Sequence, residues 1–273
     1  PAQTVKPKFR VDAANELISS EPAPRDKSEL LKFALNRLGR TVLEYQHAKI
    51  TAGDKELISE LTWNIGPGDR FGIVGINGAG KTTLLKVLQG VERVTSGSVR
   101  WSVPAKTAQQ GQAYVFQSPI MLRRSVRANL AYPLQLLGLP KAEISARVAH
   151  WAARIGLSAE LDVPAPRLSG GEQQKLALAR ALIRRPDTVF LDEPCSNLDG
   201  RSTREIEDIL CDASAAGARI IMTTHDLGQA RRLADRVLFL NKGQLEEQGP
   251  ADRFFAAPKS PGAIAFLNGD IIE

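Results

Sequence analysis

The stretch "GINGAGKT", residues 75–82, constrains the fold of this chain more than any other feature. It matches G-x-x-x-x-G-K-[ST] without exception, and it stands between the apolar run "RFGIVG" and the helical pattern "TTLLKVLQG". Glycines let the backbone wrap an anion, so that successive N–H groups and the positive end of a helix point at phosphate oxygens. A strand, a phosphate-binding loop and a helix are therefore predicted. A glycine-rich turn with a chance lysine is the alternative, which the flanking elements disfavour.

The residue types in this loop divide the work of holding a nucleotide. Lys81 is expected to hold the β- and γ-phosphates, and Thr82 to offer its hydroxyl to Mg²⁺. The full set of loop residues expected to bind the cofactor ATP is Gly75, Asn77, Gly78, Gly80, Lys81, Thr82 and Thr83.

The segment "TVFLDEP", residues 188–194, supplies a matching acidic site. Its apolar residues predict a buried strand that delivers Asp192 to the carboxyl end of a sheet, where α/β proteins bind ligands. Asp192 suits Mg²⁺, and Glu193 is expected to orient or deprotonate the attacking water. Two exposed carboxylates before Pro194 are the structural alternative, and pairing with the phosphate loop argues against it.

Apolar runs that alternate with long helical patterns predict the fold class. The runs "TVFLD", "RIIMTT" and "RVLFL" indicate a parallel sheet covered on both faces. The runs "TVLEY" and "LTWNI" add β-type segments near the start of the domain. Helical pattern dominates from residue 125 to 156, interrupted by Pro133 and Pro140, and predicts an inserted helical subdomain at about 118–168. We expect residues 1–40 to form a linker or arm and residues 41–273 to form the domain.

Composition excludes several classes of protein. Hydrophobic residues make up 43% and charged residues 24% of the chain, as in globular domains, and no apolar run is long enough to cross a membrane. The two cysteines, Cys195 and Cys211, are too few for a disulfide framework. A net charge of +6 favours anionic partners without choosing among nucleotide, RNA and a lipid surface.

The segment "LSGGEQQKLALAR", residues 168–180, opens a second helix with glycines but without a lysine. Ser169 and Glu172 have the spacing of a capping box, and this alone predicts a helix that continues to the residues before Pro186. A capping box needs no glycine pair, however. Gly170 and Gly171 expose backbone N–H groups at a positive helix end, which predicts half of an anion site.

At these motifs the chain resembles the ATP-binding cassette (ABC) ATPases, from about Thr41 to the C-terminus. In that family "LSGGE" is the signature motif, and it closes over the γ-phosphate held by a facing subunit. The resemblance further assigns a glutamine loop to Gln117 in "VFQSP", a D-loop to "SNLD" ending at Asp199, and a switch histidine to His225 in "TTHD". It implies an α/β P-loop NTPase fold of the ABC type, with a β-subdomain and an inserted helical subdomain.

The resemblance implies a Mg²⁺-dependent ATPase that dimerises head-to-tail around two ATPs. Catalytic roles fall on Glu193, His225, Gln117 and Asp199, metal binding on Thr82, Gln117 and Asp192, and binding of the facing ATP on Ser169, Gly170 and Gly171. The chain departs from the family at Ala52, where many members carry an aromatic ring that stacks on adenine. Tyr45 lies seven residues earlier, and GTP stays an alternative to ATP.

Two finer resemblances conflict. The C-terminal two thirds, including "VFQSPIMLRRSVRANLAYPLQLLGLP" and "THDLGQARRLADRVLFLNKGQLEEQGP", resemble ATPase subunits of tungstate and molybdate importers. The N-terminal third, including "DKELISELTWNIGPGDRFGIVGINGAGKTTLLKVLQG", resembles the linker and second cassette of ABC-F proteins, which act on ribosomes. The two meet between Val94 and Tyr114, in a segment without strong pattern, and a recombined or designed chimera is one explanation.

The partners follow from which resemblance holds. An importer motor pairs with permease subunits at the inner face of the cell membrane, in a cytoplasmic, peripheral location, and residues 119–132 are the expected dock. The cluster of Arg123, Arg124 and Arg127 belongs either to that dock or to a solvated helix face. A ribosome-associated factor is the alternative function, and DNA is not expected as a partner.

Overall fold

The computed structural model describes residues 43–52, 55–92, 96–101 and 103–270. The chain divides into two compact units, residues 1–40 and 41–273, and the fold described here is that of the second. The predicted arm lies outside the described residues.

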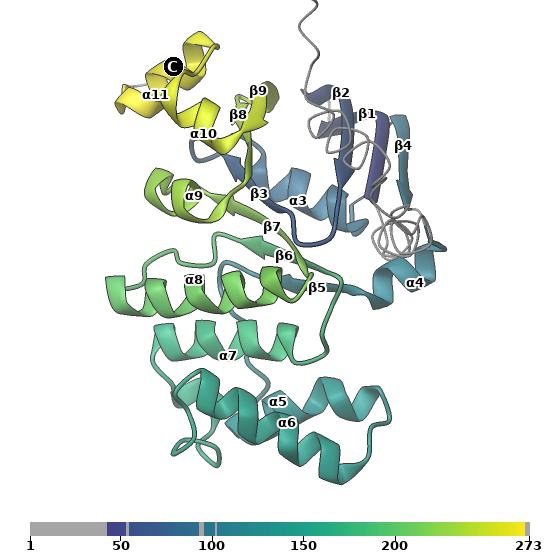
Figure 1. Ribbon diagram of the computed structural model, residues 1–273, viewed down its shortest axis with the longest axis vertical. Helices are drawn as coiled ribbons and strands as arrows, with labels where there is room; N and C mark the ends of the chain where they lie inside the picture. Colours follow the sequence, from purple (N-terminus) through teal and green to yellow (C-terminus); the bar gives the residue numbers. More distant parts are fainter. Residues whose placement is uncertain (1–42, 53–54, 93–95, 102, 271–273) are drawn as a thin grey trace, which may run out of the picture. The chain divides into compact units, whose positions relative to one another are not determined.

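A six-stranded sheet forms the centre of the domain (Figure 1). Its order is β5-β6-β7-β3-β8-β9, and the strands are β3 (Arg70–Val74), β5 (Gln112–Val115), β6 (Thr188–Asp192), β7 (Arg219–Thr224), β8 (Arg236–Asn241) and β9 (Gln244–Pro250). Pairing is parallel from β5 to β8, as predicted, and β9 pairs antiparallel to β8. The carboxyl ends of β3, β6 and β7 therefore meet at one edge of the sheet.

Both faces of the sheet are buried along β3, β6, β7 and β8, which confirms the prediction from the apolar runs. Alternate side chains, such as Phe190 and Ile221, pack in one core with α3 (Lys81–Gln89). Their neighbours, such as Leu191 and Ile220, pack on the other face with α7 (Gly170–Leu182) and α8 (Gly200–Ala215). A third core joins β8 to α9 (Leu227–Leu233), α10 (Ala251–Ala256) and α11 (Pro261–Asn268).

A second, antiparallel sheet has the order β2-β1-β4 and consists of β1 (Leu43–Ala52), β2 (Lys55–Ile65) and β4 (Ser96–Trp101). The segment that showed no strong pattern in the sequence contains β4, α4 (Ala105–Gln110) and β5. The absence of pattern there was misleading, because these elements are only four to six residues long, and β4 and β5 form by pairing with distant strands.

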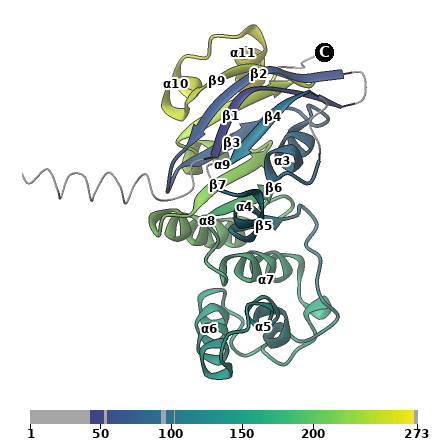
Figure 2. The same ribbon diagram turned by 90° about the vertical axis from the view of Figure 1, so that its right-hand side faces the viewer.

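The helical insertion contains α5 (Val126–Leu136), α6 (Lys141–Arg154) and the short 3₁₀ helix η1 (Ala165–Arg167). In both views α5 and α6 lie beyond α7, away from the central sheet (Figures 1 and 2). Pro133 lies inside α5, so the prediction that it interrupts the helix was wrong. Leu130 and Leu134 on either side of it are fully buried, and their packing offsets the hydrogen bond that proline cannot donate. Pro140 does separate the two helices.

Leu176, in the middle of α7, is fully buried in the core that joins the helical insertion to the sheet. We expect Leu176→Ala to lower the free energy of unfolding by about 2–5 kcal/mol, because it leaves a cavity between elements. Urea denaturation followed by circular dichroism measures this. The control is Leu137→Ala at a 54% exposed leucine, with an expected change within about 0.5 kcal/mol. Equal changes in the free energy of unfolding for the two variants would contradict the role of α7 in packing the helical insertion against the sheet.

Candidate active site

The loop 75–80 connects β3 to α3, as the motif predicts. Gly75 has a φ of 153°, and a Cβ added there would overlap the carbonyl oxygen of Leu240 on the neighbouring strand. Only glycine therefore lets the chain leave β3 so close to β8. Gly80 is left-handed with a φ of 94° and caps the N-terminus of α3, so the free N–H groups of that helix end face the loop.

Lys81 is held beneath the loop by carbonyl oxygens. Its Nζ donates to the backbone oxygens of Gly75 at 2.9 Å and Ile76 at 3.1 Å, and lies 3.7 Å from Oε1 of Glu193. Burial lowers the pKa of Lys81, and the adjacent Glu193 carboxylate opposes that shift. The ammonium group is thus a nearly buried cation that an incoming phosphate can pair with.

The carboxylate of Asp192 is buried and is surrounded by hydroxyl groups. Oδ1 accepts from Thr82 Oγ1 at 2.9 Å and from Thr223 Oγ1 at 2.7 Å, and Oδ2 accepts from the hydroxyl of Tyr114 at 3.4 Å. Burial, together with the nearby Asp192 charge, raises the pKa of Tyr114. A carboxylate beside a threonine hydroxyl at the end of a phosphate loop is an oxygen donor set that suits Mg²⁺, which takes its remaining ligands from phosphates and water. The residues present fit that ion.

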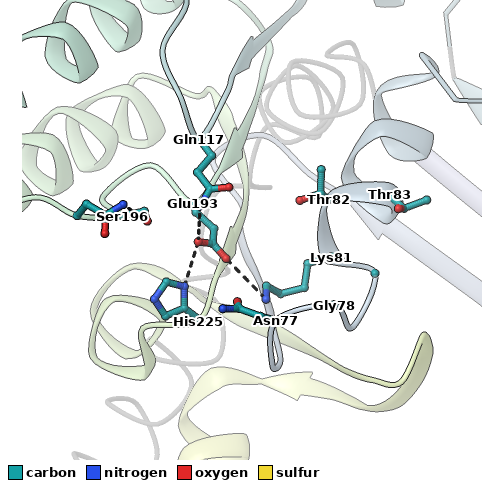
Figure 3. A pocket seen from close by; sticks show the side chains of 11 residues that line it. Asn77, Gly78, Lys81, Thr82, Thr83, Gln117, Glu193, Ser196 and His225 are labelled. Carbon is teal, nitrogen blue, oxygen red and sulfur yellow. Dashed lines mark hydrogen bonds and ion pairs between the residues drawn. The ribbon is translucent and has the colours of Figure 1, made fainter. Parts of the chain in front are cut away.

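Glu193 lies at the centre of the site (Figure 3). Its Oε2 accepts from Gln117 Nε2 at 3.2 Å and lies 3.0 Å from Nδ1 of His225, while Oε1 faces Lys81. The side chain is only 11% exposed. The backbone at Glu193 has a φ of 47°, which is unusual for a residue with a side chain and is typical of strained functional positions.

These side chains line a pocket of about 670 Å³. The residues around it are Asn77, Gly78, Gly80, Lys81, Thr82, Thr83, Gln117, Glu193, Ser196, Asn197 and His225. The structure therefore brings together the phosphate loop, the glutamine loop, Glu193 and His225, and adds two residues of the predicted D-loop.

Six predicted residues do not line this pocket. Gly75 and Asp192 lie directly behind it, hydrogen-bonded to Lys81 and Thr82, whereas Ser169, Gly170, Gly171 and Asp199 have no such contact with the lining. Ser169 and Glu172 form the predicted capping box, in which the Glu172 carboxylate accepts from the backbone N–H and the hydroxyl of Ser169, both at 2.8 Å. Asp199 caps α8 by accepting from the backbone N–H groups of Arg201 and Ser202. The signature segment thus presents its helix end elsewhere than to the pocket of its own chain.

Two contacts of the site were missed by sequence reasoning. Tyr114 and Thr223 both donate to Asp192, and neither belongs to a motif that carries chemistry. The one available signal was that Thr223 directly precedes Thr224 and His225 at the end of a predicted strand. The pairing of β6 with β7, which sets Asp192 opposite Thr223, appears only in the fold.

The hydrogen bonds from the Ser169 backbone and hydroxyl hold the pKa of Glu172 below its ordinary value of 4.5. A lowered carboxyl pKa stabilises the fold above the unfolded-state pKa, and that contribution is lost as the pH falls from about 4.5 through the folded-state value. We therefore expect Glu172→Gln to be less stable than the parent at about pH 7, with a difference that shrinks toward about pH 4. Urea denaturation across this range measures it.

As a control, Glu172→Gln is also introduced into a protein that carries Ser169→Ala. That protein lacks the hydroxyl donor, so the pH-dependent part of the Glu172→Gln effect on stability is expected to be smaller. A parent-minus-variant difference that stays constant over the whole range would contradict the assignment of the charge effect to this cap.

Comparison with known proteins places the chain in a family. A family model described as "ABC transporter" matches residues 58–196, just over half of the chain. The methionine import ATP-binding protein MetN of Xanthomonas euvesicatoria pv. vesicatoria is 35% identical over 235 residues, covering 81% of this chain and 70% of the relative. MetN of Geobacillus kaustophilus is 34% identical over 226 residues, covering 79% and 66%.

Solved structures agree. The chain superposes on cbiO1 from Clostridium perfringens, described as part of the ABC transporter complex cbiONQ, with a TM-score of 0.72 and 26% identity over 80% of this chain and 92% of that one. A second structure, described as the ATP-binding subunit of an ABC transporter, matches the fold with a TM-score of 0.69 at 24% identity, over 78% of this chain and 91% of that one. With the pocket described above, these matches show that the chain belongs to the ABC transporter family and is a Mg²⁺-dependent ATPase of that family.

Proposed function

We propose that this chain is the motor subunit of an importer, and that two copies enclose two ATPs between them. The observation that carries this proposal is the division of phosphate-binding groups: Lys81 lies in the pocket, whereas Ser169 and Gly171 lie outside it. Both groups are suited to bind anions, since Lys81 lies at the N-terminus of α3 and Ser169 with Gly171 lies at the N-terminus of α7. A head-to-tail pair of copies brings the second set over the triphosphate held by the first.

Within one pocket, each side chain has a proposed role. Lys81 releases Glu193 and pairs with the β- and γ-phosphates, while Thr82 and Asp192 hold Mg²⁺ together with Gln117. When bound, Mg²⁺ neutralises charge on the phosphate oxygens. His225 contacts the γ-phosphate, and Asp199 of the facing copy supports that geometry.

Glu193 is the proposed water-directing residue. Its carboxylate is held between Gln117 and His225, so it reaches the space between the phosphate loop and these two side chains. A carboxylate there accepts a hydrogen bond from a water molecule and orients its lone pair in line with the γ-phosphate. Hydrolysis removes the phosphate that both copies bind, and the pair then separates.

The permease dock is proposed at a groove between β5, α5 and α7. Exposed apolar residues line it, including Phe116, Ile120, Tyr132 and Leu136, whose exposures run from 38% to 70%. Arg180 and Arg184 add positive charge. Contiguous apolar surface of this kind marks a site of protein contact. The groove includes part of the predicted dock, residues 119–132.

Of the basic cluster, Arg127 lies on a solvated face, whereas Arg124 packs against Tyr132 of the groove. Arg127 pairs with the exposed Asp162 at 3.0 Å, and the guanidinium of Arg124 lies 6.0 Å from the ring centre of Tyr132. Arg127 is thus already engaged within the chain.

The proposed solute and partner are based on the similar proteins described above. Methionine is proposed rather than tungstate or molybdate, because the relatives described above are named for methionine import. Their alignments cover about four fifths of the chain, and the family match runs through the predicted seam at 94–114. Both facts favour one importer cassette over a ribosome-associated factor or a chimera of the two.

We propose a location at the inner face of the cell membrane, where an importer motor meets its permease. We found no helix among the described residues with the length and apolarity to span a bilayer.

Glu193→Gln tests the chemistry. The amide keeps the shape of the side chain but cannot accept a proton, so we expect turnover to fall by about 10²–10⁴-fold while ATP-dependent dimerisation persists. Phosphate release and sedimentation velocity measure the two quantities. Asp252→Asn, at an exposed carboxylate on α10, is the control and keeps the parental rate. A Glu193→Gln protein that hydrolyses ATP at the parental rate removes Glu193 from the mechanism.

Co-purification tests the partner. The Glu193→Gln protein, trapped with ATP, is expected to be recovered with membrane fractions and to bring down a permease identified by mass spectrometry. Leu136→Glu in the groove is expected to reduce that recovery by roughly tenfold or more, because burial of one leucine contributes about 1.5–3 kcal/mol. Val91→Glu, at a 65% exposed site outside the groove, is the matched control. Recovery with ribosomes instead of membranes would contradict the importer proposal.

A further inference from the structure

Thr223 contacts both Asp192, the last residue of β6, and Glu193, which follows that strand. It stands on β7, opposite Asp192 in the parallel register, and its exposure is 0%. A buried hydroxyl needs protein partners, because water cannot reach it. Both partners of Thr223 belong to the active site.

The hydroxyl of Thr223 makes two hydrogen bonds of opposite polarity. It donates to Oδ1 of Asp192 at 2.7 Å, and it accepts from the backbone N–H of Glu193 at 3.1 Å. One hydroxyl has a single donor and two lone pairs, so it makes both bonds at once. The hydroxyl thereby connects the proposed metal-binding carboxylate to the backbone of the proposed water-directing residue.

The Thr223 hydroxyl contacts two residues, Asp192 and Glu193, whose conformations must be held in place. Glu193 has the disfavoured φ of 47°, and its N–H is also bonded to the carbonyl oxygen of Thr223 at 3.1 Å. Oδ1 of Asp192 is the atom that Thr82 also contacts. One side chain thus fixes the rotamer of Asp192 and the turn that aims Glu193.

Packing alone does not call for a hydroxyl at this position. The register partner of Thr223 on the other side is Ile73, and Ile221 on its own strand points to the same face, both of them buried. A valine has nearly the same shape as threonine and would satisfy those neighbours. The hydroxyl oxygen of Thr223 instead forms its hydrogen bonds with the two acidic residues.

We propose that Thr223 is a positioning residue for ATP hydrolysis, which holds the Asp192 carboxylate and the Glu193 backbone in one fixed arrangement. The proposal rests on the roles proposed above for these two residues. Side chains that orient a metal ligand in this way typically affect metal affinity or activity by about 10–100-fold.

The test compares Thr223→Val, Thr223→Ser and Thr223→Ala. For each variant we measure thermal unfolding, ATP hydrolysis, and the dissociation constant of ATP in EDTA and in Mg²⁺. For Thr223→Val we expect ATP affinity in EDTA within about twofold of the parent, and losses of roughly 10–100-fold in both kcat and the affinity gained on adding Mg²⁺. Thr223→Ser keeps the hydroxyl and is expected to stay within about threefold of the parent in both. Serine and alanine differ by one oxygen, so that pair isolates the hydroxyl even where valine impairs folding.

Two further variants distinguish an error in the role of Thr223 from an error in the proposed metal site. Thr188→Val removes another buried threonine hydroxyl, at the opposite end of β6, and is expected to keep the parental Mg²⁺ dependence. Asp192→Asn is expected to lose the gain from Mg²⁺. If it keeps that gain, the proposed metal site itself is overturned. If Asp192→Asn loses it while Thr223→Ala retains parental kcat and Mg²⁺ dependence, only the role of Thr223 is overturned. A serine variant as impaired as alanine overturns that role as well, because the methyl group is then what matters.

Discussion

The buried carboxylate of Asp192 is the group on which the arrangement of this domain depends. A carboxylate that is 5% exposed is stable only where donors replace water, and here the donors come from three separate elements. Thr82 reaches it from the start of α3, Thr223 from β7, and Tyr114 from β5. Those contacts exist only if β6 lies between β5 and β7 and if α3 covers the face of the sheet toward which Asp192 points. Strand order, helix placement and metal chemistry are thus parts of one constraint.

Charge balance in the pocket follows from the same logic. Lys81 is nearly buried and has two carbonyl oxygens and the carboxylate of Glu193 as its partners, the last at 3.7 Å. A triphosphate carries several negative oxygens and offers Lys81 stronger partners than a carboxylate at that distance. In the proposed mechanism the phosphates and the Glu193 carboxylate repel each other, while Gln117 and His225 contact the other oxygen of that carboxylate and hold it in place.

The parts of the fold that the sequence predicts well are those whose signals are local. Strands β6 and β7 begin and end where their apolar runs do, because strands buried on both faces need uninterrupted apolar residues. The loop motif likewise predicts its own strand and helix. Segments β4, α4 and β5 could not be predicted, since they are short and stabilised by distant partners, and Pro133 was misjudged because buried leucines keep α5 intact. Within the site, the motif residues were named from the sequence, whereas Thr223 and Tyr114 depend on which strands pair.

The signature segment and the D-loop form one connected unit, and this bears on how two copies would act on each other. A Cβ at Gly171 would lie 3.0 Å from Oγ of Ser202, so the start of α7 lies close against the start of α8. Ser202 in turn donates to Asp199, and Asn197 and Ser196 of the same loop line the pocket. In the proposed head-to-tail pair, a phosphate bound at the N-terminus of α7 in one copy therefore lies next to a side chain that is hydrogen-bonded to the D-loop of that copy. Since this loop borders the copy's own pocket, the connection gives each site a physical means to respond to the other.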